Sequence, residues 1–273
     1  SVMESLESKV GDDGSEGQRD YFVTWLFKGM LQRERARAVK RDRVQRSRIA
    51  RDTFEELIFE AGEESLLGLR GWFEMSKIGE VLGNYDAAFS DYNDTIESIR
   101  TALDQAQDLN LDRGTQEYLF NLLQEASDRG ADALFQQGKI EETLEFCAAF
   151  KEDLKNYGEE GEEPFDVAHP TYGHPVFLTE ARALSETGDA AKVAASLEMV
   201  QRINDAHPSD ITGVRAKNVL KDILEIQVGL VSGTLLFEVA KGDYQAREYE
   251  RAIQGLKKAY GAMSQGERDQ LGL

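Results

Sequence analysis

Three residues near the middle of the chain have side chains that could bind a metal ion. Asp166, His169 and His174 lie close together in the run FDVAHPTYGHP, and imidazole and carboxylate groups are common zinc ligands. Both histidines precede a proline, which favours extended backbone, so the shape of a loop sets the distance between them. A proline-stiffened connection between two helical parts explains the same residues, and we predict no metal site and no cofactor.

The chain carries no sequence motif of an enzyme. It has no glycine-rich phosphate loop, no serine elbow between glycines and no His-Glu-x-x-His, the patterns that mark several classes of catalytic site. The acidic run over 159–166 lacks the ligand alternation of a calcium loop. The single cysteine, Cys147, excludes an internal disulfide and a cysteine-rich metal cluster. We therefore predict no catalytic residues and a protein that is not an enzyme.

Charge is distributed unevenly along the chain. The formal net charge is −19, which argues against nucleic acid or an anionic membrane as the partner of the whole surface. The segment 28–51 nevertheless holds ten Lys or Arg against Glu34 and Asp42, a net +8. We favour charge complementarity with the chain's own acidic helices, and an arm that binds nucleic acid, anionic lipid or an acidic partner remains open. The basic patch comprises Arg33, Arg35, Arg37, Lys40, Arg41, Arg43, Arg46, Arg48 and Arg51.

Composition predicts an all-α protein. Only four prolines occur in 273 residues, and the tracts between them are rich in residues that favour helix. No apolar run approaches the ~20 residues of a membrane-spanning helix. The lone cysteine fits a reducing compartment, which favours a cytoplasmic location. The chain begins without Met and is expected to be a piece of something longer, so a missing signal is uninformative.

Proline, glycine and charge divide the chain into five parts. A polar lead-in over 1–19 precedes one long basic helix over 20–61, which is apolar at both ends and charged in its middle. Helix pairs over 62–157 are separated by an acidic, His-Pro-containing loop over 158–174 from further helix pairs over 175–273. Within the paired parts, helices are expected over 64–82, 86–109, 115–137, 139–156, 175–187, 189–206, 210–241 and 246–262.

An internal repeat organises these helices. Ser76, Gly83, Tyr85, Ala88 and Tyr92 define a pattern of a small residue, a turn, an apolar residue, a second small residue and a larger one. Small residues let two antiparallel helices approach to the lower end of the ~8–10 Å interaxial range, and glycine can end the first helix with a positive φ. The pattern therefore indicates packing and not catalysis. Its other copies are Ala131, Gly138, Ile140, Thr143 and Cys147; Ala181, Gly188, Ala190, Val193 and Leu197; and Ala240, Arg247, Tyr249, Ala252 and Leu256.

These units resemble tetratricopeptide repeats. The closest unit is 69–99, in which Trp72, Gly83, Tyr85, Ala88, Tyr92 and Ile96 match the family signature, and 246–260 resembles the second half of another. The spacings of 55, 50 and 59 residues between the units exceed the usual period of ~34, so the repeats are divergent, with longer helices or connections.

The resemblance implies a concave surface made by the first helix of each pair, which would bind a peptide or a partner protein without catalysis. Its groove-facing residues would be Arg70, Phe73, Lys77, Glu80, Leu178, Arg182, Phe237, Lys241 and Tyr244. The chain would then be a protein-interaction scaffold, and part of a larger protein or assembly. Two alternatives stay open: a structural subunit that docks through 20–61, or an electrostatic adaptor for nucleic acid or anionic membrane through 28–51. The sequence indicates neither the partner nor the oligomeric state.

Overall fold

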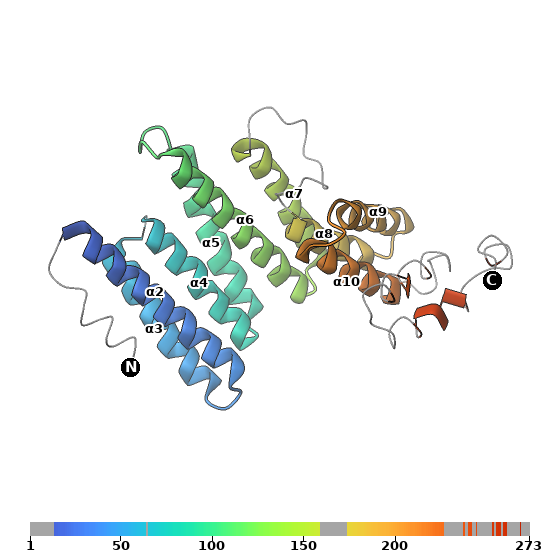
Figure 1. The fold of residues 1–273 in the computed structure, drawn as a ribbon, viewed down its shortest axis with the longest axis horizontal. Coiled ribbons are helices and arrows are strands. Elements are labelled where there is room, and N and C mark those ends of the chain that lie inside the picture. The colour runs from blue at the N-terminus through green and yellow to red at the C-terminus, as the bar shows by residue number, and fades with distance from the viewer. Residues whose placement is uncertain are drawn as a thin grey trace. The chain divides into compact units, whose positions relative to one another are not determined.

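The computed structural model describes residues 14–63, 65–158 and 174–226, together with isolated positions between 237 and 268. Every regular element in those three ranges is an α-helix, as the sequence predicts (Figure 1). None of the helices there combines the length and the apolar character that crossing a membrane requires. The helices are α2 (Gly14–Ala38), α3 (Arg43–Ala61), α4 (Leu66–Leu82), α5 (Tyr85–Asp104), α6 (Arg113–Gln136), α7 (Ile140–Tyr157), α8 (His174–Glu186), α9 (Ala190–Ala206) and α10 (Ile211–Ile226).

The chain divides into two compact units. Unit 1 comprises 1–139 and 155–160, and unit 2 comprises 140–154 and 161–273. In unit 1 each helix from α2 to α6 packs against the next, and α2 also contacts α4, which contacts α6. In unit 2, α8, α9 and α10 contact one another. Consecutive helices run antiparallel within each unit (Figure 1). The fold is therefore a divergent tetratricopeptide-like array of antiparallel helix pairs.

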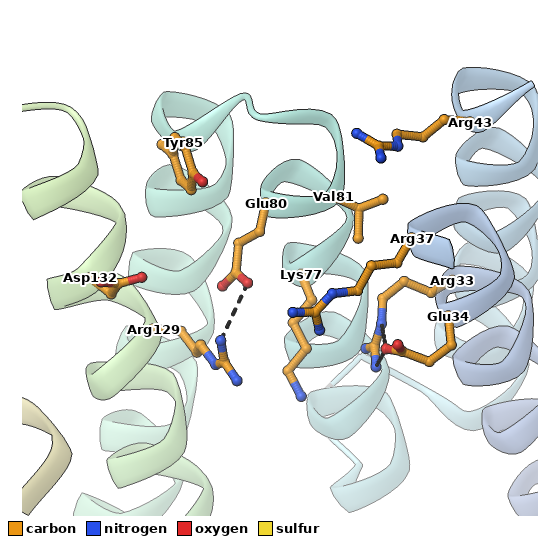
Figure 2. Close-up of a pocket in the computed structure, with 10 residues that line it drawn as sticks. All are labelled: Arg33, Glu34, Arg37, Arg43, Lys77, Glu80, Val81, Tyr85, Arg129 and Asp132. Atoms are coloured by element: carbon orange, nitrogen blue, oxygen red, sulfur yellow. Dashed lines mark hydrogen bonds and ion pairs between the residues drawn. The ribbon is translucent and has the colours of Figure 1, made fainter. Parts of the chain in front are cut away.

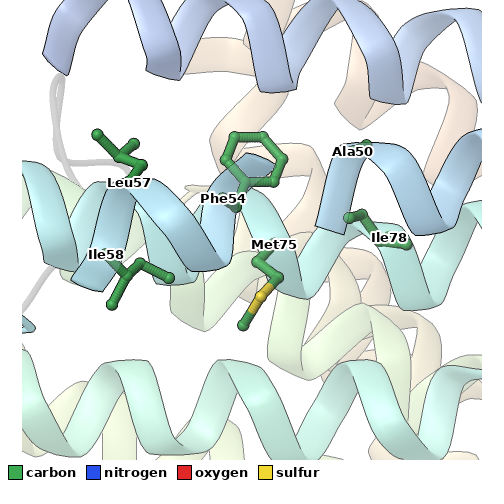
Figure 3. Packing of buried hydrophobic residues seen from close by; sticks show 6 residues of the cluster. All are labelled: Ala50, Phe54, Leu57, Ile58, Met75 and Ile78. Carbon is green, nitrogen blue, oxygen red and sulfur yellow. The ribbon is translucent and has the colours of Figure 1, made fainter. Parts of the chain in front are cut away.

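The single helix expected over 20–61 is wrong, because the structure has two helices there. The chain turns over 39–42, and Asp42 adopts a left-handed conformation with φ 61°, which Asp tolerates better than most residues. The reversal lets the apolar ends of α2 and α3 pack together. Trp25 and Leu26 lie against a buried cluster formed by α3 and α4. Figure 3 shows the members of this cluster, Ala50, Phe54, Leu57, Ile58, Met75 and Ile78.

A close approach of backbone to ring fixes this hairpin. A Cβ atom added at Gly29 of α2 would lie 2.5 Å from Cε1 of Phe54, a separation that no side chain tolerates. Phe54 is fully buried, so the two helices can meet there only because one residue has no side chain. The glycine that the sequence placed inside one long helix therefore serves a contact between two helices.

The first three copies of the repeat pattern keep their glycine turns, and most of their small and plug residues are buried. Gly83, Gly138 and Gly188 end helices with φ of 72°, 72° and 71°. The N–H of Gly83 donates to the Glu80 carbonyl at 3.0 Å, and that of Asn84 to the Gly79 carbonyl at 2.9 Å, a hydrogen-bond pattern that satisfies the last carbonyls of a helix. The pattern's small and plug residues that are fully buried are Ser76, Ala88, Tyr92, Ala131, Thr143, Cys147 and Ala181. Two expected plug residues are not buried: Leu197 of the third copy is half-buried and Leu256 of the fourth is 37 % exposed. Of the rest of the fourth copy, Ala240 is buried, whereas Arg247, Tyr249 and Ala252 lie outside the described residues.

Helix α3 carries one more copy of the pattern that the repeat places on the second helix of each pair. Ala50, Phe54 and Ile58 on α3 repeat the spacing of Ala88, Tyr92 and Ile96 on α5, with a separation of 88 − 50 = 38 residues. All six side chains are buried. This separation is close to the usual period of ~34 residues. The segment expected to precede the repeats therefore belongs to them.

Replacing Ala88 by Arg tests this packing. A Cβ added at Gly79 would already lie 2.8 Å from the Cβ of Ala88, so the site has no room for a longer side chain and no partner for a charge. We expect a loss of about 3 kcal/mol or more in the free energy of unfolding, measured with urea. The matched control is Ala87→Arg, because the neighbouring Ala87 is exposed and should tolerate the cation. Equal urea concentrations at the midpoint of unfolding for the two variants would contradict the close helix contact at Ala88.

Candidate functional site

A buried carboxylate lies at the centre of unit 1. Glu74 on α4 is 0 % exposed, yet it is an acid. Its Oε1 accepts from Nη2 of Arg70 at 2.8 Å and from Nζ of Lys77 at 3.0 Å. Its Oε2 forms an ion pair with Nη1 of Arg33, which reaches across from α2. These four residues form the Glu74 cluster, and three cations thus meet one carboxylate.

Helical spacing explains the local half of this cluster. Residues three and four positions apart share one face of a helix, so Arg70 and Lys77 both reach Glu74 from one turn away. The same two cations flank the ring of Phe73, with Cζ of Arg70 5.0 Å and Nζ of Lys77 3.9 Å from its centroid. Phe73 also contacts the ring of Tyr92 at 6.0 Å. The cations are therefore held by both an acid and an aromatic face.

Ion pairs also connect α4 to α6. Nη1 of Arg70 lies 3.2 Å from Oε2 of Glu125, and Oε2 of Glu80 lies 3.4 Å from Nη1 of Arg129. The hydroxyl of Tyr92 donates to Oε1 of Glu80 at 2.5 Å. Together with the reach of Arg33 from α2, these contacts hold the first helices of three successive pairs, α2, α4 and α6, in fixed register.

The first helices surround a polar pocket of about 460 Å³. Figure 2 shows its walls: α2 and the start of α3 on one side, α4 and the start of α5 in the middle, and α6 on the other. Five lining residues are basic and three are acidic. The lining residues are Arg33, Glu34, Arg37, Arg43, Lys77, Glu80, Val81, Tyr85, Arg129 and Asp132.

The cluster shifts the pKa values of its members. Burial opposes ionisation of Glu74, but the charges of Lys77 and Arg33 and their hydrogen bonds outweigh it, so the pKa of Glu74 is lowered. Burial lowers the pKa of Lys77, against the attraction of Glu74. Burial, with the negative charge of Glu80 beside it, raises the pKa of Tyr92. Glu74 is therefore a charged group in the interior, and Tyr92 is a neutral hydrogen-bond donor.

The groove residues predicted on α4 divide into two groups. Lys77 and Glu80 line the pocket, whereas Phe73 is buried beneath it at 1 % exposure. Arg70 does not line it and serves the Glu74 cluster and α6. The ring of Phe73 thus supports the cations instead of facing a partner.

The other predicted groove residues belong to unit 2. Leu178 is buried and Arg182 is half-buried on α8. Phe237 is half-buried, and Lys241 and Tyr244 are exposed. The unit 1 pocket is built without any of them, so their role in binding stays a prediction.

The basic patch has more than one role. Arg33 pairs with Glu74 and with Glu34 at 2.9 Å, and Arg51 pairs with Glu55 at 2.9 Å. Within the part of the chain that the structure describes, the other seven members form no ion pair. Arg43 and Arg46 are half-buried, and Arg35, Arg37, Lys40, Arg41 and Arg48 are exposed. Acids of the chain thus neutralise Arg33, across to another helix, and Arg51, within its own helix, and not the patch as a whole.

The sequence interpretation missed the contribution of α6. Adding the repeat spacing of 55 residues to Arg70 and Lys77 gives Glu125 and Asp132, which are the partner of Arg70 and a wall of the pocket. That signal was present in the sequence. Glu74 had no comparable signal, because Glu between two cations at helical spacing is typical of an exposed helix face.

The candidate metal ligands do not assemble in the described residues. His174 is buried at the start of α8, with its ring 4.4 Å from that of His207. Nδ1 of His207 in turn lies 2.7 Å from Oδ2 of Asp210. No group of three His, Cys, Asp or Glu residues able to hold a metal occurs in the described ranges. Asp166 and His169, like the acidic run over 159–166, lie outside them.

Comparison with known proteins gives no family assignment. No protein-family model matches the chain, and no curated protein matches it. Among solved structures, a similar chain is described as a "Podosopora anserina putative kinesin light chain" with "nearly identical TPR-like repeats". It is 14 % identical, the match covers 85 % of this chain and 93 % of that chain, and the TM-score is 0.36. The tetratricopeptide-like description of the fold rests on the helix pairs and turns of this chain.

Replacing Glu74 by Gln tests the cluster. The neutral amide removes the buried counter-charge that Arg33, Arg70 and Lys77 share, so we expect a loss of about 3–5 kcal/mol in the free energy of unfolding at pH 7. Because the folded-state pKa of Glu74 is lowered, its contribution is present above the unfolded pKa of about 4.3 and disappears as pH falls through the folded value. The difference in the free energy of unfolding between the wild-type chain and the variant should therefore become smaller at acidic pH.

Glu117→Gln is the matched control, because Glu117 pairs with Arg113 on an exposed surface, with side-chain exposures of 62 % and 83 %. We expect this variant to lose less than about 1 kcal/mol. Urea unfolding at several pH values measures both. If the difference in the free energy of unfolding between wild type and Glu74→Gln stays constant as the pH falls, Glu74 is not held ionised in the folded chain.

Proposed function

We propose that the chain is a non-enzymatic protein-interaction scaffold that binds a peptide or a partner protein through the first helices of unit 1. One observation carries this proposal: α2, α4 and α6 surround a pocket whose walls are tied together by ion pairs. Binding to a surface that is already ordered loses less conformational entropy than binding to a mobile one. The walls also present charged groups, which give a site specificity for its partner.

The chemistry of the lining supports binding over covalent catalysis. The ten lining residues are charged except for Val81 and Tyr85, and none of them is Ser, Thr, Cys or His. The aliphatic hydroxyl, thiol and imidazole nucleophiles of covalent catalysis are therefore missing from this lining. Arg and Lys supply directed positive charge without a reactive nucleophile in their ionised form. We propose that the chain is a section of a larger protein or assembly and that it recognises a segment of a partner protein.

A second candidate function uses an apolar surface instead of the charged pocket. Large apolar side chains on the α2–α3 hairpin are exposed: Phe27 at 58 %, Val44 at 72 % and Phe59 at 82 %. Exposed large apolar side chains can mark a surface that contacts another chain. This observation favours a structural subunit that docks through 20–61 without using the pocket.

Site-specific photo-crosslinking in cells of the source organism distinguishes the two candidates. A photoreactive aromatic residue replaces Val81 in the pocket, Phe59 on the hairpin, or the exposed Ser90 on α5 as a control. The scaffold proposal expects a discrete protein adduct from position 81 and none from 59 or 90. Adducts from 59 alone would favour docking through the hairpin. Adducts of similar yield from all three positions, or none from 81, would overturn the proposal.

A further inference from the structure

We propose that the pocket of unit 1 receives acidic side chains from an extended segment of a partner protein, and that Arg37 and Arg43 bind their carboxylates beside Lys77. This inference rests on the proposed scaffold function and names the chemistry of its partner. Its support comes from which charges in the pocket already have a counter-charge and which do not.

Three of the five pocket cations are already paired. Arg33 and Lys77 hold Glu74, and Arg129 holds Glu80. Arg37 and Arg43 form no ion pair with any residue that the structure describes. Nε of Arg43 is moreover buried without a hydrogen-bond partner, and a buried donor without an acceptor costs stability. An acceptor supplied from outside would satisfy it.

The two unpaired cations, Arg37 and Arg43, line the same side of the pocket. Figure 2 shows Arg37 and Arg33 extending from α2 toward Lys77 on α4, with Arg43 above them. Like charges brought together in a partly enclosed space repel one another more strongly than in open water. An anion bound among them removes that repulsion and gains charge-assisted hydrogen bonds, in which Arg can use two donors at once.

The Glu74 cluster positions this wall. The buried carboxylate of Glu74 pairs with Arg33, Arg70 and Lys77 and so fixes where their side chains lie. A cation that is held in place loses little rotamer freedom when a ligand arrives. Glu74 would thus act through Arg33 and Lys77, without itself touching the partner.

The lining favours separate carboxylates over a phosphate backbone. Glu34, Glu80 and Asp132 stand among the cations, so a continuous row of phosphates would meet repulsion at three points. Acidic side chains spaced along a peptide can instead approach the cations and avoid the acids. Tyr85 is the one aromatic lining residue, which offers little of the base stacking that single-stranded nucleic acid uses.

Fluorescence anisotropy with defined probes tests the inference on the full chain. The probe is a labelled peptide of alternating glycine and glutamate, acetylated and amidated so that its only carboxylates are side chains. A peptide with glutamine for glutamate and a single-stranded DNA of equal charge are its comparisons. We expect the glutamate peptide to bind about tenfold more tightly than either.

Two charge reversals on one helix give the matched variants. Arg37→Glu should weaken binding of the glutamate peptide about tenfold, and Arg35→Glu should change it less than about twofold. Both side chains are exposed on α2, both substitutions change the net charge equally, and only Arg37 lines the pocket. Melting curves confirm that each variant is folded. Equal losses in the two variants, absence of binding by the glutamate peptide, or preference for DNA would each overturn the inference.

The crosslinker at Val81 separates this inference from the scaffold proposal on which it rests. If adducts from Val81 persist in the Arg37→Glu background, the scaffold function stands and the acidic ligand is wrong. If Val81 yields no adduct in the wild-type chain, the scaffold proposal itself fails. Loss of the adduct with Arg37→Glu and retention with Arg35→Glu supports both.

Discussion

The carboxylate of Glu74 is the constraint on which unit 1 depends. A buried charge is tolerated only when partners replace the water that it loses, and here the partners come from two helices. Arg70 and Lys77 follow from the helix that carries Glu74, but Arg33 must arrive from α2. The position of α2 against α4 is thereby fixed by an electrostatic requirement as well as by apolar packing. A pair of this kind contributes specificity of arrangement more than net stability.

Two kinds of contact therefore hold the helices of unit 1 together. Small residues and apolar plugs, such as Ala88 with Tyr92 and Ala50 with Phe54, hold each second helix against its neighbours. Charged residues connect the first helices, through Arg33, Arg70 and the Glu80–Arg129 pair. The apolar contacts make the array, and the polar contacts give one face of it a defined pattern of charge. That division is why a chain of net charge −19 can present a basic pocket.

The local signals in the sequence predicted most of the fold. Glycine at 83, 138 and 188 marked three helix ends, and each adopts the positive φ that glycine permits. The break over 39–42 was missed because it contains neither Pro nor Gly, and the turn there lets both apolar ends of the hairpin be buried. Of the residues that line the pocket, the expected groove supplied two. Lys77 and Glu80 followed from the repeat, but Arg33 and Glu74 lie 41 residues apart, and no local pattern brings such residues together.

Hydrogen exchange tests the central claim most directly. Amide exchange is compared between the free chain and the chain bound to the protein that was crosslinked through Val81. The account predicts added protection in the segments that line the pocket, 33–37 of α2, 77–81 of α4 and 129–132 of α6, with the exposed face of α5 around Ser90 unchanged. Protection confined to α3 around Phe59, with those three segments unchanged, would contradict it.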